Sequence, residues 1–64
     1  MRCLNMSWEE ALQAMHNGKR VVHEYFTSEE YFEMQYGVIV CENGYNMSDW
    51  FKGEKWQLTG WGVL

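Results

Sequence analysis

Residues 7–18 read SWEEALQAMHNG, and this stretch sets the first element of the fold. Ser7 and Glu10 have the spacing of a capping box, in which the serine hydroxyl accepts from a free backbone N–H and the glutamate accepts from the backbone of the cap. Apolar residues then recur at i, i+3, i+4 and i+7, the spacing of a helix with one buried face, at Trp8, Ala11, Leu12 and Met15. Asn17-Gly18 can adopt the left-handed backbone conformation that ends a helix. The stretch therefore predicts a helix from about Trp8 to Asn17.

The chain after this helix is rich in residue types that favour strands. Strands are predicted over residues 20–26, from residue 31 to residue 36, and over residues 38–41, where β-branched and aromatic side chains run together or alternate with polar ones. Gly37 marks a bulge or a tight bend, and Asn43-Gly44 is a strong hairpin signal. These patterns predict an antiparallel sheet.

The last third of the chain is harder to assign. Residues 46–53 fit either one helical turn ended by a glycine or a bent edge strand. Residues 55–59 predict the last strand, and residues 60–64 a flexible tail with an apolar anchor. Trp8 and Trp56 are assigned to the core. The expected fold class is α+β, a single domain over residues 1–64, with one N-terminal helix packed on an antiparallel sheet of about four strands.

Composition limits the kinds of partner. A chain of 64 residues buries only roughly 60% of its unfolded surface, yet aromatic residues make up 17% of this one. We therefore expect some aromatic surface to meet a partner or a second copy of the chain. Five Lys and Arg against nine Asp and Glu give a net charge of −4, which disfavours direct nonspecific binding of nucleic acid. An acidic surface could instead meet a basic protein.

The two cysteines and the termini indicate the compartment. Cys3 and Cys41 lie far apart without a CxxC spacing, and the first residues do not resemble a signal peptide. No apolar run approaches the roughly 20 residues of a membrane span. A cytoplasmic protein with reduced thiols is expected, without a metal or other cofactor, since His16 and His23 do not complete a paired zinc-ligand pattern.

No residue pattern points to catalysis. Ser7 is better explained as a helix cap than as a nucleophile, and Glu9 and Glu10 diverge because they are adjacent on a helix. His16 falls in the last helical turn, where a surface position suits it, whereas His23 lies in a strand of mixed pattern where a cross-strand or ligand contact is possible. The expectation is a binding protein and not an enzyme.

The helix and the strand after it carry a resemblance. Glu10-Ala11-Leu12, Gly18-Lys19 and Val21 match an opening motif "F-x-E-A-L-x-x-L-x-x-G-K-x-V", and residues 55–58 stand in place of a closing "D-W-x-I". This pattern resembles the second type of Thoeris anti-defence proteins, small phage proteins whose family also includes an anti-CRISPR protein. The chain departs from the pattern where the family has arginine, glycine and tryptophan, at His23, Tyr25 and Phe26 respectively.

The resemblance implies a homo-oligomer in the host cell cytoplasm that sequesters a cyclic nucleotide made by a host immune enzyme. Such a site needs an aromatic face for the base, a donor for phosphate and a carboxylate for ribose hydroxyls. The corresponding candidates here are Phe26 or Trp50 for stacking, His23 for phosphate and Asp49 for ribose. Trp50 follows the predicted hairpin, in an irregular segment of the kind where ligand contacts tend to lie.

Two other functions stay open at this stage. The first is a protein-binding inhibitor of a host defence nuclease, in which exposed Trp and Tyr side chains ringed by carboxylates press on the partner. The second is a small structural or regulatory phage protein with an ordinary protein partner. The carboxylates Glu29, Glu30 and Glu33 are most simply a solvated edge, and a functional acidic patch is the alternative.

Overall fold

The computed structural model describes residues 4–64. Helix α1 (Trp8–His16) is followed by strands β1 (Val21–His23), β2 (Phe32–Gln35) and β3 (Val38–Cys41), and then by the short helix α2 (Lys55–Leu58) and strand β4 (Trp61–Val63). The strands form one antiparallel sheet in the order β3-β2-β1-β4. This arrangement confirms the α+β prediction of one N-terminal helix packed on a four-stranded antiparallel sheet.

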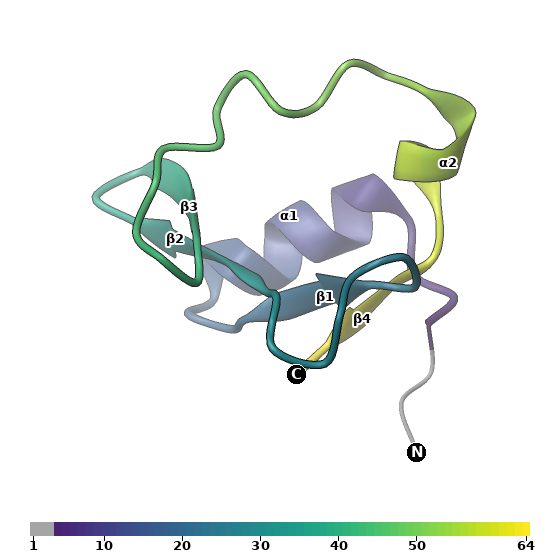
Figure 1. Cartoon of the computed structure of the whole chain (residues 1–64), viewed down its shortest axis with the longest axis horizontal. Helices are drawn as coiled ribbons and strands as arrows, with labels where there is room; N and C mark the ends of the chain where they lie inside the picture. Colours follow the sequence, from purple (N-terminus) through teal and green to yellow (C-terminus); the bar gives the residue numbers. More distant parts are fainter. Residues whose placement is uncertain (1–3) are drawn as a thin grey trace.

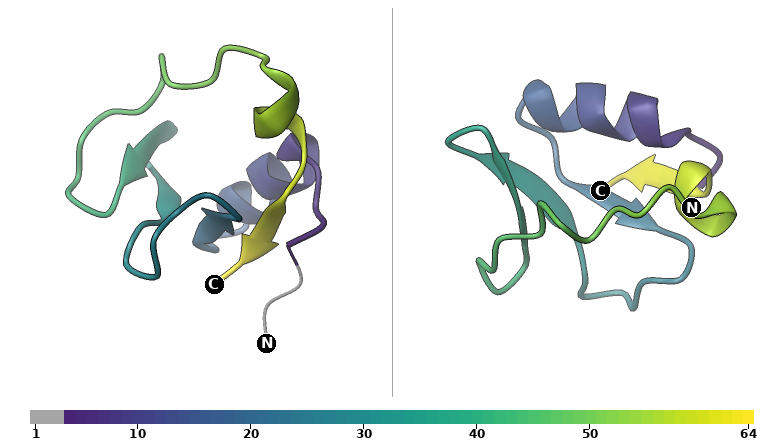
Figure 2. Two further views of the ribbon diagram at one scale, coloured as in Figure 1. Left: turned by 45° about the vertical axis from the view of Figure 1, so that its right-hand side comes forward. Right: turned by 90° about the horizontal axis from the view of Figure 1, so that it is seen from above.

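Helix α1 begins as the sequence predicted. The Ser7 hydroxyl accepts from the backbone N–H of Glu10 at 3.1 Å, and the Glu10 carboxylate accepts from the backbone N–H of Ser7 at 2.9 Å. The helix ends at His16, and Gly18 takes the left-handed conformation with φ +83°. Figure 2 shows α1 lying along β1 and β4, so its apolar stripe is buried against the sheet.

The hairpin between β2 and β3 is tight and regular. Four residue pairs align from Phe32 opposite Cys41 to Gln35 opposite Val38, which leaves Tyr36 and Gly37 as a two-residue turn. Both turn residues have positive φ, 53° and 77°, as a type I′ turn requires. Of the bulge and the tight bend that the sequence allowed at Gly37, the structure has the tight bend.

The segment from 42 to 54 connects β3 to α2 as an arch (Figure 1), and we call it the arch. It begins with the turn predicted at Asn43-Gly44, where Gly44 donates to the Cys41 carbonyl and has φ +81°. Asn46 then makes a single bridge to Val40, and a turn follows in which Trp50 donates to the Met47 carbonyl. The arch is therefore neither the edge strand nor the helix that its sequence allowed.

Three sequence predictions in this part of the chain are wrong. Residues 55–59 are not the last strand, because residues 55–58 form helix α2 and Thr59 is its C-cap. Residues 60–64 are not a flexible tail, because Trp61–Val63 is strand β4, paired with β1 in three register pairs. Trp56 is not a core residue, since it is 44% exposed. Period-two alternation over four residues is too short to distinguish a strand from one helical turn.

The strand predicted over residues 20–26 is shorter than expected. Strand β1 ends at His23, and a turn follows in which Phe26 donates to the His23 carbonyl at 2.9 Å. Its three residues are all buried, because β1 lies between β2 and β4 in the sheet. This turn lifts Phe26 out of the strand and places its ring over the core.

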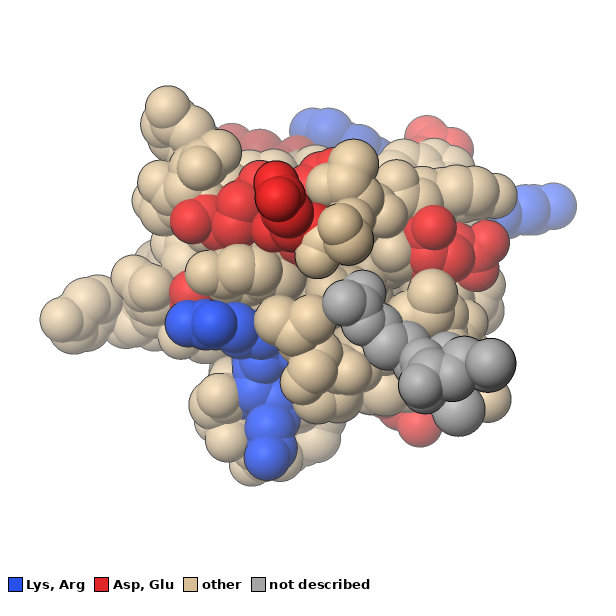
Figure 3. Space-filling model, turned by 60° about the horizontal axis from the view of Figure 1, so that its bottom comes forward, with Lys and Arg blue, Asp and Glu red and all other residues tan. Residues whose placement is uncertain are grey.

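Charge is unevenly distributed over the molecule. Figure 3 shows a large cluster of carboxylates on the face it draws, with fewer Lys and Arg side chains. Arg20 is one of the few cations near the sheet, where it approaches Glu33 at 3.7 Å and lies over the ring of Tyr31 at 4.7 Å. This pair is solvated, so its effect on stability is small.

Candidate functional site

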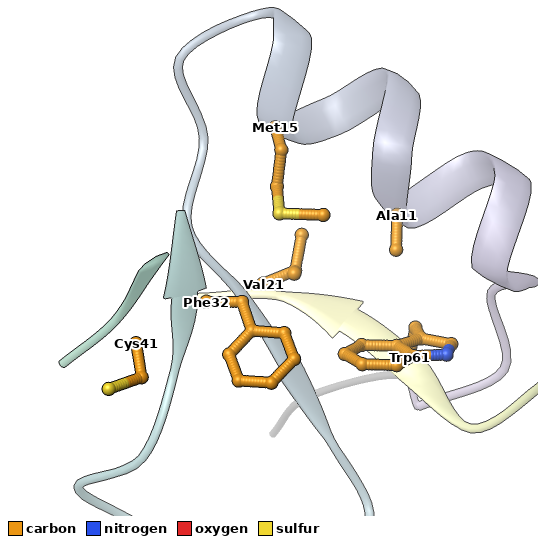
Figure 4. Close-up of a cluster of buried hydrophobic side chains, with 6 residues drawn as sticks. All are labelled: Ala11, Met15, Val21, Phe32, Cys41 and Trp61. Atoms are coloured by element: carbon orange, nitrogen blue, oxygen red, sulfur yellow. The ribbon is translucent and has the colours of Figure 1, made fainter. Parts of the chain in front are cut away.

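Trp61 lies at the centre of the core. Three of the candidate ligand residues predicted from the sequence, His23, Phe26 and Trp50, pack around it. The Trp61 side chain is 0% exposed, and its indole N–H donates to the Gln57 carbonyl at 2.7 Å. Figure 4 shows the ring beside Phe32, on the side of the sheet to which Ala11 and Met15 point from α1. Five rings have centroids within 6 Å of the Trp61 centroid: Trp8, His23, Phe26, Phe32 and Trp50. We call these six residues the aromatic cluster.

His23 is a structural member of this cluster. It is 2% exposed, and its Nε2 donates to the backbone carbonyls of Trp56 at 2.7 Å and Thr59 at 2.8 Å. Its Nδ1 accepts from the backbone N–H of Tyr25 at 3.1 Å. This pattern fits the neutral imidazole with its proton on Nε2. Both nitrogens are occupied by the chain itself, so the role of phosphate donor predicted for His23 does not agree with the structure.

Phe26 and Trp50, the two alternative stacking residues of the sequence hypothesis, both pack against Trp61. Trp50 packs edge-on against Phe32 at 4.9 Å between ring centroids, and it has further ring contacts with Trp8, Phe26, Trp56 and Trp61. Phe26 likewise contacts Phe32 at 5.0 Å. Both rings are half-buried, and most of their surface is used in packing on the core.

Asp49, the candidate for ribose recognition, is exposed on the arch beside Trp50. Of the four residues predicted to bind a ligand, the structure thus gathers His23, Phe26 and Trp50 and leaves Asp49 in solvent. Asp49 remains free to bind a partner, whereas the other three stabilise the fold.

Sequence reasoning missed Gln57, which organises the arch. Its buried side chain accepts from the backbone N–H groups of Lys52 at 2.9 Å and Glu54 at 3.1 Å, and donates to the Trp50 carbonyl at 3.1 Å. A lone glutamine between apolar residues carries no pattern that would identify it. Its three hydrogen bonds hold the arch, and with it Trp50, against the aromatic cluster.

A different set of aromatic side chains reaches solvent. Tyr25 and Trp56 pack edge to face with ring centroids 6.0 Å apart, above His23. Tyr25, Tyr36 and Tyr45 are the most exposed aromatic residues, and each lies in or next to a turn. The three exposed tyrosines thus lie at turns, whereas the aromatic cluster contains Trp8, which was predicted for the core, and Trp50 and Trp61, which were not.

Several kinds of site are not found among the residues that the structure describes. Residues 4–64 contain no group of three or more potential metal ligands and no detected pocket. Cys41 is buried and free, and Cys3 lies outside the described residues. No helix in the described part is long and apolar enough to cross a membrane.

Comparison with known proteins adds no relative. The chain matches no protein-family model, no curated protein and no solved structure. The resemblance to the Thoeris anti-defence proteins stays a prediction.

Proposed function

We propose that this protein acts by binding a partner protein that has a basic surface. The observation that carries the proposal is the segment from residue 21 to residue 51, which has six carboxylates, no Lys or Arg, and three tyrosines exposed to solvent. We call it the acidic segment. It includes strands β1 to β3 and most of the arch.

The charge of the acidic segment differs in sign from that of the rest of the chain. Six carboxylates without Lys or Arg give it a formal charge of −6, and the other residues carry five Lys and Arg against three carboxylates, or +2. A separation of charge of this kind steers a basic protein toward the negative segment and favours one orientation of the complex. A surface kept soluble by charge alone needs no such separation, because interspersed charges serve that purpose equally well.

The tyrosines of the acidic segment add contact area. Tyr25 and Tyr45 are each 69% exposed, and Tyr36 is fully exposed. Tyrosine is enriched at protein interfaces because a rigid ring buries a large area at low conformational cost, while its hydroxyl still hydrogen-bonds. Three exposed tyrosines in a segment that carries six carboxylates therefore favour a protein partner with basic groups around apolar pockets.

The proposal is tested by affinity capture with the immobilised protein, in a lysate of the cell in which the protein occurs. We expect retention of a basic protein that is eluted by salt, because exposed charges are screened as ionic strength rises. Glu29→Lys should lower the association rate on the order of threefold or more. Glu9→Lys makes the same charge change on the exposed face of α1, outside the acidic segment, and is the matched control.

Two results would contradict this function. One is that the wild-type protein retains no basic protein at low salt. The other is that Glu9→Lys weakens the complex as much as Glu29→Lys, because the acidic segment would then have no special part in binding.

A second candidate is the sequestration of a cyclic nucleotide by a homo-oligomer, as the resemblance implies. The observation that favours it is a run of three aromatic rings that reaches solvent beside Asp49. The ring centroids of Trp50 and Trp56 are 5.5 Å apart, and those of Trp56 and Tyr25 are 6.0 Å apart. A second copy meeting this surface could enclose a base. Native mass spectrometry with cyclic di- and trinucleotides and cyclic ADP-ribose isomers tests the idea. A discrete mass shift on an oligomer supports it, and spectra unchanged by every compound count against it.

A further inference from the structure

We propose that Tyr36 is the anchor residue of this interface, inserted by the β2–β3 turn into a pocket of the basic partner. The inference rests on the proposed function and assigns its central contact. It comes from a conflict between the residue at this position and the backbone that it must adopt.

The backbone at Tyr36 is unfavourable for tyrosine. Tyr36 has φ +53°, and no other non-glycine residue among residues 4–64 has positive φ. The first position of a type I′ turn favours asparagine, aspartate or glycine, since a bulky side chain clashes with its own backbone in the left-handed region. The four residue pairs of the β2–β3 hairpin impose this conformation.

Packing within the chain does not offset that strain. The Tyr36 side chain is 103% exposed, so it buries no surface in the fold. Tyr25, by contrast, packs against Trp56 and His23. A strained residue that stabilises nothing in its own chain indicates a use outside it.

The turn also prepares Tyr36 for binding. A two-residue turn closed by paired strands holds the ring at the tip of the hairpin, so little conformational entropy is lost when it inserts. The pocket that fits it has apolar walls for the ring and a hydrogen-bonding group for the hydroxyl. Lys or Arg side chains of the partner surround this pocket, because the acidic segment on both sides of Tyr36 has six carboxylates and no Lys or Arg of its own.

The substitution Tyr36→Asn separates the stability of the turn from binding of the partner. Asparagine followed by Gly37 is a preferred type I′ sequence, so we expect the melting temperature to rise by about 4–8 °C. The dissociation constant for the basic protein captured by the wild type should increase on the order of 30-fold. Tyr45→Asn, at an exposed tyrosine in another turn, should weaken binding much less, and Tyr36→Phe measures the hydroxyl alone.

A photocrosslinking side chain, p-benzoylphenylalanine, at position 36 identifies the contact directly. An adduct with the captured basic protein from position 36, and little from position 45, supports the anchor. Equal binding by the wild type and the more stable Tyr36→Asn overturns it and leaves the proposed function intact. An adduct between two copies of this chain also overturns it. If the wild type retains no basic protein, the proposed function fails and the anchor fails with it.

Discussion

Helix α1 and the segment from residue 54 to residue 64, which holds α2 and β4, are stabilised in opposite ways. The N-terminus of α1 is capped by Ser7 and Glu10, three residues apart. Helix α2 and the turn after it are held by His23, which binds carbonyls 33 and 36 residues away in the chain. The first element is specified by its own residues, and the second by contacts that exist only in the folded molecule.

This difference explains where substitutions should be most damaging. Contacts of high sequence separation converge on Trp61 and His23, and Gln57 joins the arch to helix α2, so removal of one of these side chains affects several elements. The cap of α1 serves only its own helix. Four predictions follow this gradient, and urea unfolding followed by circular dichroism measures the free energy of unfolding in each.

Trp61→Ala should have the largest effect. It removes the ring at the centre of the aromatic cluster and the indole hydrogen bond to Gln57. Truncation of a buried tryptophan costs about 3–5 kcal/mol, which is enough to unfold a domain of this size. Trp56→Ala, at an exposed tryptophan five residues earlier, is the control and should cost much less. Equal losses for the two would show that Trp61 is not the centre of the core.

His23→Phe should come second. The ring is kept, but the carbonyls of Trp56 and Thr59 and the N–H of Tyr25 lose their partner. Unsatisfied buried groups of this kind should cost about 2–3 kcal/mol in total. His16→Phe, on the exposed face of α1, should change the free energy of unfolding by less than about 0.5 kcal/mol. A variant at position 23 as stable as the wild type would refute the structural role of this imidazole.

Gln57→Met should have an intermediate effect. Methionine has a similar length, but it cannot bond to Trp50, Lys52 or Glu54, and we expect a loss of about 1–2 kcal/mol because water reaches part of the arch. Hydrogen exchange should show faster opening of the arch than of α1. Gln13→Met, at an exposed position of α1, is the control. Unchanged exchange in the arch would mean that other contacts hold it.

Ser7→Ala should have the smallest effect of the four, about 1 kcal/mol, because it removes one hydrogen bond at a solvated helix end. Ser28→Ala, at an exposed residue of the turn from residue 27 to residue 30, serves as the control. In a double-mutant cycle, Glu10→Ala should be less costly once Ser7 is replaced, since the two halves of the capping box depend on each other. Strict additivity would argue against the box.

The candidate site also combines features that nearby residues predict with contacts between residues far apart in the chain. The sequence hypothesis named His23, Phe26 and Trp50 as ligand contacts, and the structure brings the three rings together around Trp61. It could not show that the rings would close on Trp61 and on one another, since Trp61 lies between two glycines, Gly60 and Gly62, that favoured a flexible tail. Gly62 in fact pairs with Val22, and a Cβ at Gly60 would collide with the carboxylate of Glu24. Gly60 also has φ +86°, a conformation that favours glycine, so the glycine there marks a fixed backbone and not a flexible tail.

The sequence by itself determined α1 with its cap, the strand character of residues 32–35 and 38–41, and the presence of a turn at Asn43-Gly44. Each of these is specified by residues within a few positions of one another, through helix spacing, strand alternation or a turn that requires positive φ. Only the tertiary structure decided that residues 55–58 are helical and that residues 61–63 are a strand. Their conformation depends on hydrogen bonds from His23 and pairing with β1, and no local pattern encodes partners so distant in the chain.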